Sequence, residues 1–128
     1  MSFLRKGTFI SQTTNTTDVE VLLPEIKDRI LKKDKTTANS LFNIIVDKAL
    51  ELKGKPILIG DVAEVAEQLG HKIKAAQLYE VAGTTFSNQT IYFLSKALTL
   101  YNEYGEVADT QRIEKKLKLH LGVPKRDQ

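Results

Sequence analysis

The 128-residue chain contains no cysteine. This absence excludes disulfide bridges, thiolate metal sites and a cysteine nucleophile, and it is compatible with a reducing compartment such as the cytoplasm, where we expect the protein. Long apolar runs are also missing. The N-terminal residues lack the apolar core of a signal peptide, and no stretch approaches the roughly 20 apolar residues of a membrane helix. We therefore expect a soluble, non-secreted protein without a membrane span.

Groups that could carry catalysis are scarce. The only two histidines, His71 and His120, have no neighbours at metal-ligand spacing. The sequence shows no glycine-rich phosphate loop, H-E-x-x-H pair or nucleophile elbow. The acids Asp61, Glu64 and Glu67 share one predicted helix, but carboxylates on a solvated helix face are common and need not have a perturbed pKa. We expect no enzymatic activity, no metal and no cofactor.

Size and composition are those of a globular protein. A chain with 41% hydrophobic and 27% charged residues can bury a core of its own and lies far from the composition of disordered chains. Residues 6–18 are rich in threonine and lack helical periodicity. We expect a flexible N-terminal arm over 1–18, a single helical domain over 19–123 and a basic tail over 124–128.

The net charge of +3 is mild and arises at the two ends of the chain. Residues 1–36 carry seven Lys or Arg against five acids, 37–105 carry six against seven, and 106–128 carry six against four. A dedicated phosphate binder usually concentrates its cations along one face. The distribution weakens a nucleic-acid function without excluding it.

Apolar residues recur at steps of three and four along most of the chain, which predicts helices and no strand. Proline and glycine mark several boundaries: Pro24 and Pro56 suit a first helical turn, whereas Gly54, Gly70 and Gly122 suit helix ends. The predicted helices span about 24–33, a second from a cap at Thr36 or Thr37 to Gly54, then 56–70, 73–87, 89–104 and 106–121. The predicted fold is all-α, built from antiparallel helical hairpins in a bundle or array of five to six helices.

A repeat emerges from the glycine spacing. Gly54 to Gly70 is 16 residues, Gly70 to Gly105 is 35, and Gly105 to Gly122 is 17, so two helices make a hairpin of about 35 residues. Within it, small, aliphatic and aromatic residues recur at fixed steps: Ile59, Val62, Ala63 and Ala66, then Ala75, Tyr79 and Ala82, then Leu94, Ala97, Leu98 and Tyr101. Over about 57–122 the chain resembles a short tetratricopeptide array. Thr110 and Glu114 depart from that pattern, as befits a terminal helix with a polar outer face.

The resemblance implies a function. In tetratricopeptide-like domains the first helix of each hairpin lines a groove that holds a peptide, so we expect a non-enzymatic adaptor or complex subunit. The exposed hairpin ends also favour a homo-oligomer or a place in a larger complex. The expected groove is polar and mildly acidic, suited to a peptide with basic or hydrogen-bonding groups. Its residues are Glu64, Glu67 and Gln68 on one helix and Tyr92, Thr99, Asn102 and Glu103 on another.

A small basic nucleic-acid-binding protein or ribonucleoprotein subunit is the alternative. Residues 62–79 have the Ala-x3-Gly spacing of a helix-turn-helix, in which Lys72 and Lys74 would meet phosphates. The last predicted helix is amphipathic and places Arg112, Lys115 and Lys116 opposite its apolar residues. These five cations are the candidate nucleic-acid contacts.

Overall fold

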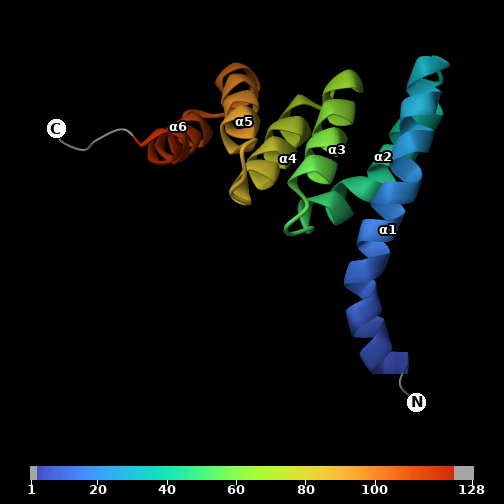
Figure 1. Ribbon diagram of the computed structural model, residues 1–128. Coiled ribbons are helices and arrows are strands. Elements are labelled where there is room, and N and C mark those ends of the chain that lie inside the picture. The colour runs from blue at the N-terminus through green and yellow to red at the C-terminus, as the bar shows by residue number, and fades with distance from the viewer. Residues whose placement is uncertain (1–2, 123–128) are drawn as a thin grey trace. The chain divides into compact units, whose positions relative to one another are not determined.

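The computed structural model describes the backbone of residues 3–122 and the side chains of residues 16–122 (Figure 1). Over the described residues the chain forms helices and no strand, which confirms the predicted all-α fold of helical hairpins. The helices are α1 (Phe3–Leu31), α2 (Lys35–Leu50), α3 (Pro56–Gln68), α4 (Lys72–Thr84), α5 (Thr90–Tyr104) and α6 (Val107–Leu121).

The chain divides into two compact units, Met1–Gly54 and Lys55–Gln128. Helices α1 and α2 pack together in the first unit, and α3 to α6 pack in sequence in the second. The expected domain limits, an arm over 1–18, one domain over 19–123 and a tail over 124–128, stay predictions. The tail lies outside the described residues.

Helix α1 begins far earlier than the sequence suggested. The predicted start at Pro24 is wrong, because α1 begins at Phe3 and Pro24 lies inside it. Proline within a helix removes one hydrogen bond and costs about 3 kcal/mol. Here Val19, Leu23 and Ile26 continue an apolar stripe across the proline and are buried, and their packing offsets that cost.

A tight turn joins α1 to α2 without a glycine. Lys33 adopts the left-handed conformation with φ 63°, and the amide of Asp34 donates to the carbonyl of Arg29 at 2.8 Å. The predicted cap at Thr36 or Thr37 is also wrong. The carboxylate of Asp34 accepts the amide of Thr37 at 3.2 Å and caps α2, because the N-terminal cap must precede the amides that it satisfies.

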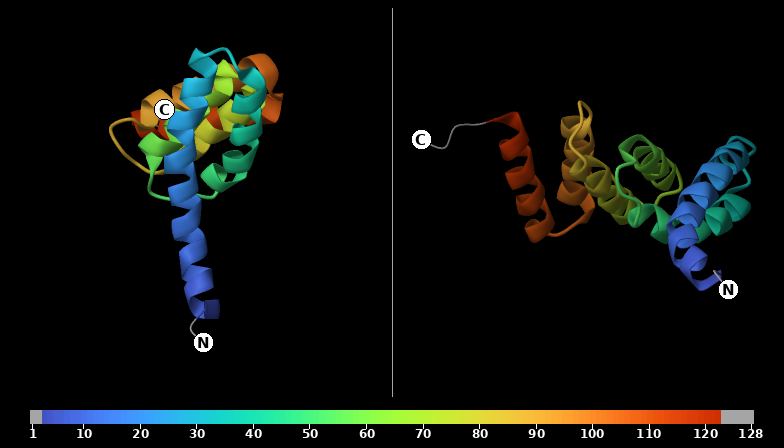
Figure 2. Two further views of the ribbon diagram at one scale, coloured as in Figure 1. Left: turned by 90° about the vertical axis from the view of Figure 1, so that its right-hand side faces the viewer. Right: turned by 60° about the horizontal axis from the view of Figure 1, so that its bottom comes forward.

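Helix α1 extends past the end of α2 (Figures 1 and 2). The two helices contain 29 and 16 residues, which correspond to lengths of about 43 Å and about 24 Å. The ammonium group of Lys48, in the last turn of α2, contacts the carboxylate of Asp18. The helical residues that precede Asp18 therefore run toward and beyond the C-terminal end of α2.

The turns of the second unit follow the sequence prediction. Pro56 opens α3, and Gly70, with φ 88°, closes it in a turn where the amide of His71 donates to the carbonyl of Ala66 at 2.9 Å. Gly105 ends α5, and Gly122 ends α6 with φ 69°. Because each turn is short, neighbouring helices run antiparallel.

Small residues let the helices of the second unit approach closely. A Cβ atom added at Gly60 of α3 would lie 2.5 Å from Phe93 of α5, and one at Gly83 of α4 would lie 2.8 Å from Leu94 of α5. Of the residues that carry the repeat pattern, Leu98 is only half-buried. The others are buried in this core: Ile59, Val62, Ala63, Ala66, Ala75, Tyr79, Ala82, Leu94, Ala97 and Tyr101.

The break between α4 and α5 is an ordered loop built around Thr90. This buried threonine accepts the amide of Ser87 at 2.9 Å and donates to the carbonyl of Thr85 at 3.2 Å. At the same loop the exposed ring of Phe86 stacks on His120 of α6, with ring centroids 5.6 Å apart. The loop is thereby tied to the last turn of α6.

Candidate functional site

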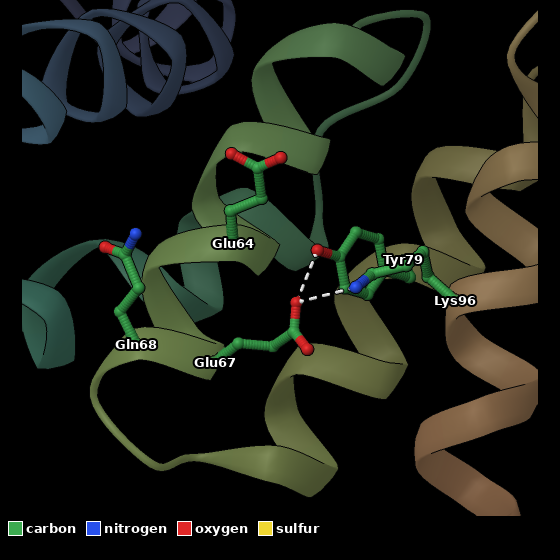
Figure 3. Close-up of a pocket in the computed structure, with 5 residues that line it drawn as sticks. All are labelled: Glu64, Glu67, Gln68, Tyr79 and Lys96. Carbon is green, nitrogen blue, oxygen red and sulfur yellow. Dashed lines mark hydrogen bonds and ion pairs between the residues drawn. The ribbon is translucent and has the colours of Figure 1, made fainter.

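Three of the predicted groove residues line one open hollow. Glu64, Glu67 and Gln68 of α3 border a hollow of about 450 Å³ together with Tyr79 of α4 and Lys96 of α5. Figure 3 shows that Glu67 turns toward Tyr79 and Lys96, whereas Glu64 and Gln68 point away from them. The predicted α3 residues therefore share a surface, but they differ in what they can do there.

Glu67 holds three helices together. Its Oε1 atom accepts the hydroxyl of Tyr79 at 2.7 Å and lies 3.3 Å from Nζ of Lys96. The same ammonium group lies 5.5 Å from the centroid of the Tyr79 ring, within range of a cation–π contact. Burial, reinforced by the hydrogen bond to Glu67, raises the pKa of Tyr79 above its ordinary value. The phenol therefore stays protonated and donates.

Glu64 and Gln68 are the unengaged polar groups of the hollow. Both side chains are exposed, and within the described part of the chain neither enters an ion pair or a side-chain hydrogen bond. An exposed carboxylate beside a free amide can accept and donate hydrogen bonds to a bound peptide. These two groups, rather than Glu67, are available to a ligand.

The α5 side of the predicted groove is less uniform. Tyr92 is half-exposed, and its ring lies 5.5 Å from that of Phe93, which in turn abuts Gly60 of α3. The hydroxyl of Thr99 donates to the carbonyl of Ser95 at 3.1 Å, so this proton is turned toward its own helix. Among the four predicted α5 residues, Tyr92 is thus linked to α3 through its neighbour Phe93.

Asn102, another predicted groove residue, lines a second hollow. This hollow has a volume of about 330 Å³ and lies at the corner between α5 and α6. Glu103 is exposed on α5 but does not line either hollow. The structure therefore separates the predicted α5 stripe into a part near α3 and a part near α6. The second hollow is lined by Tyr101, Asn102, Gly105, Glu106, Val107, Thr110, Gln111 and Glu114.

Two of the predicted nucleic-acid contacts are engaged inside the protein. Glu80 of α4 accepts Nε and Nη2 of Arg112 at 2.8 and 2.9 Å and Nζ of Lys116 at 2.8 Å. It also accepts the hydroxyl of Tyr101 at 3.0 Å. Burial alone would raise the pKa of Glu80, but these hydrogen bonds outweigh it and lower the pKa to about 2. The two cations neutralise a partly buried carboxylate.

The remaining predicted cations do not gather around that pair. The ammonium group of Lys72, on α4, lies 5.9 Å from the centroid of the Tyr104 ring, within range of a cation–π contact. Lys74 and Lys115 are exposed and enter no ion pair among the described residues. Of the five candidate contacts, only these two are unengaged cations.

Sequence reasoning missed Lys96 and Glu80. Tyr79 and Tyr101 were expected as packing residues, and both are buried, but their hydroxyl groups also need acceptors. That requirement was the available signal for a nearby carboxylate. No sequence signal pointed to Lys96, because its partner Glu67 lies two helices away.

The described residues contain no group of three or more His, Cys, Asp or Glu side chains that could hold a metal ion. None of the helices between Phe3 and Leu121 is both long and apolar enough to cross a membrane. Comparisons with protein-family models, with curated proteins and with solved structures find no match for this chain.

Proposed function

We propose that the second unit is a non-enzymatic peptide-binding module of the tetratricopeptide-like kind. Two hairpins in sequence, α3–α4 and α5–α6, support this proposal, as do the small residues buried where the repeat pattern has them. In such an array α3 and α5 are the first helices of their hairpins. Their shared face is then the binding surface.

The charge of that face carries the proposal. Lys96 is neutralised by Glu67 at 3.3 Å, whereas Glu64 on the same hollow has no cation. The unbalanced charge is therefore negative. Gln68 adds a hydrogen-bonding group to the hollow, and Tyr92 of α5, which lies outside its lining, adds a half-exposed aromatic ring. A Lys or Arg side chain of an extended peptide complements this surface through charge and through stacking on the tyrosine.

The protein acts as an adaptor or as a subunit of a complex in this proposal. The absence of cysteine fits a reducing compartment, and we propose the cytoplasm as the place of action.

Fluorescence polarisation with the full chain tests the proposal. Labelled peptides of equal length, rich in lysine and arginine, in glutamate, or in serine, are titrated at low and moderate salt. We expect the basic peptides to bind best and Glu64→Lys to weaken them about tenfold, which corresponds to about 1.4 kcal/mol. Glu51→Lys is the matched control, because Glu51 is an exposed acid of the first unit.

Two results would contradict the proposal. One is equal affinity for basic and acidic peptides, or basic-peptide binding that Glu64→Lys leaves unchanged. The other is tight binding of a nucleic-acid duplex that collapses as salt rises, with Lys74→Glu and Lys115→Glu abolishing it. That second result supports the nucleic-acid alternative.

A further inference from the structure

The surface proposed to bind peptides has an apolar end. Two half-exposed side chains form it: Ile57 in the first turn of α3 is 54% exposed, and Tyr92 in the first turn of α5 is 47% exposed. The ring of Phe93 lies against Gly60, one turn after Ile57. The centroid of the same ring is 5.5 Å from that of Tyr92. Ile57 and Tyr92 therefore belong to one surface.

Helices α3 and α5 run in the same direction across this surface. Gly60 lies against Phe93 near the starts of the two helices. Further along both helices, Glu67 lies 3.3 Å from Lys96. The apolar end and the hollow are therefore separated along the helix axes.

The separation of the two ends follows from the geometry of α3. Glu64 is seven residues after Ile57 in this helix, which corresponds to nearly two turns and a rise of about 10.5 Å. Both side chains therefore leave the same face of α3. Glu64 points away from Tyr79 and Lys96 (Figure 3), so its carboxylate is accessible to a ligand.

Tyr92 lies close to the hollow, although it is not part of the lining. Burial and a hydrogen bond raise the pKa of Tyr79 most, and the phenol of Tyr92 and the carboxylate of Glu64 raise it further. Since Tyr79 lines the hollow, both groups lie near it. The half-exposed ring and the free acid are thus parts of one continuous surface.

The spacing selects the conformation of a ligand that reaches both ends. In a polyproline II helix, residues three apart lie on the same face and are about 9.3 Å apart, close to the rise of about 10.5 Å between Ile57 and Glu64. A β-strand brings residues two or four apart to one face, at about 6.6 or about 13 Å. A helical ligand needs apolar contacts at successive turns, whereas Glu64, two turns after Ile57, is an acid. Polyproline II fits best.

We infer that the ligand is a proline-rich segment in the polyproline II conformation, with a proline and an arginine or lysine three residues apart. The proline packs against Ile57 and Tyr92, and the cation pairs with Glu64. Gln68 donates to a backbone carbonyl of the ligand, since this conformation leaves its carbonyls without internal partners. Grooves with aromatic side chains recognise such segments because the ligand is already ordered before it binds.

This inference rests on the proposed peptide binding and specifies its ligand. The preference for basic over acidic peptides belongs to the proposed function. The preference for a proline at a fixed distance from the cation belongs to the inference. The two preferences can therefore fail separately.

Nuclear magnetic resonance titration of the nitrogen-labelled full chain tests the inference. Peptides of one composition place a single proline two, three or four residues from a single arginine, in either chain direction, and a further peptide has glycine in place of the proline. We expect a spacing of three to bind at least about fivefold more tightly than the other peptides, which corresponds to about 1 kcal/mol. The amide signals of Ile57, Glu64 and Tyr92 should shift.

Variants of the apolar end give the second measurement. We expect Ile57→Ser and Tyr92→Ala each to weaken the three-spaced proline peptide about fivefold and to leave the affinity of the glycine peptide unchanged. Ile44→Ser and Tyr104→Ala are matched controls, because these side chains are 49% and 47% exposed and lie outside the apolar end. Circular dichroism checks folding, and Ile57→Ser alone decides if Tyr92→Ala unfolds.

Three results would overturn the inference. Equal affinity at all spacings, or no loss when glycine replaces proline, overturns it and leaves the proposed function intact if basic peptides still bind through Glu64. Variants of Ile57 and Tyr92 that behave like their controls have the same meaning. Loss of the preference for basic peptides overturns the proposed function and this inference with it.

Discussion

Tyr101 donates its hydroxyl proton to Glu80 at 3.0 Å, across the contact between α5 and α4. The pair has a counterpart in Tyr79 and Glu67, which join α4 to α3 at 2.7 Å. In both pairs the next helix supplies a cation that contacts the carboxylate and lies 5.5 Å from the tyrosine ring. The second unit thus uses one arrangement twice: an acid, a tyrosine and a cation from three successive helices.

Removing a tyrosine hydroxyl should destabilise the protein. Tyr101→Phe and Tyr79→Phe each delete a hydrogen bond to a carboxylate, and we expect each to lower the free energy of unfolding by about 1.5–3 kcal/mol. Urea denaturation measures the loss. Tyr92→Phe is the control, because the Tyr92 hydroxyl has no hydrogen-bond partner in the described part of the chain. Equal stability of Tyr92→Phe and Tyr101→Phe would contradict the arrangement.

Acid should weaken the fold through Glu80. Its pKa of about 2 in the folded protein lies below the ordinary 4.5. The carboxylate therefore contributes stability that is fully present above about pH 4.5 and is lost as the pH falls toward 2. The difference between the two pKa values corresponds to about 3 kcal/mol.

The variant Glu80→Gln distinguishes the contribution of Glu80 to the pH dependence of stability from that of the other acids. We expect the variant to be less stable than the wild type at neutral pH and the gap in unfolding free energy to narrow as the pH falls below 4.5. Urea denaturation at several pH values measures both. A gap that is independent of pH would show that the Glu80 charge does not stabilise the fold.

The close approach of α3 and α5 should not tolerate a methyl group. In Gly60→Ala the new Cβ would lie 2.5 Å from Cε1 and 2.7 Å from Cζ of Phe93, a ring that is buried. We expect a loss of about 1–2 kcal/mol, because overpacking exceeds the gain in helix propensity. Combining the change with Phe93→Leu should cost less than the sum of the single changes. Strict additivity would argue against the contact.

The cations of α6 should differ in their effect on stability. Arg112→Ala breaks the contacts with Glu80 and Asp109, and we expect a loss of about 1 kcal/mol, since the side chain is partly exposed. Lys115→Ala should leave the melting temperature unchanged, because Lys115 enters no ion pair in the described residues. Thermal unfolding of the two variants makes the comparison. An equal response would mean that the Glu80 contacts do not contribute.

Local signals predicted most of the helices but not their ion pairs. Gly70 and Gly105 mark turns because glycine and helix ends are coupled over a few residues. The helix start predicted at Pro24 was wrong because that prediction considered only the hydrogen bonds that proline removes from a helix. It did not include the burial of Leu23 and Ile26, which depends on packing against α2. Asp34 was overlooked as a cap because the turn before it contains no glycine and is formed by a left-handed lysine instead.

The candidate site was harder to predict than the fold. The acidic stripe at Glu64, Glu67 and Gln68 was predicted from helical periodicity, and these residues do share a hollow. Which of them is free depends on Lys96, and its distance from Glu67 is set by how α5 packs beside α3. Hydrophobic periodicity reports which face of a helix is buried, and it does not show which side chains of two helices far apart in sequence pair with each other.

The short turns between α3, α4, α5 and α6 also determine how the second unit can fold. Each helix packs mainly on its sequence neighbour, so no long loop has to close before favourable contacts form. Chains dominated by such local contacts fold in microseconds to milliseconds. Folding of the second unit can start at any of its hairpins and spread along the chain, with the Glu67 and Glu80 contacts forming last because each needs three helices in place.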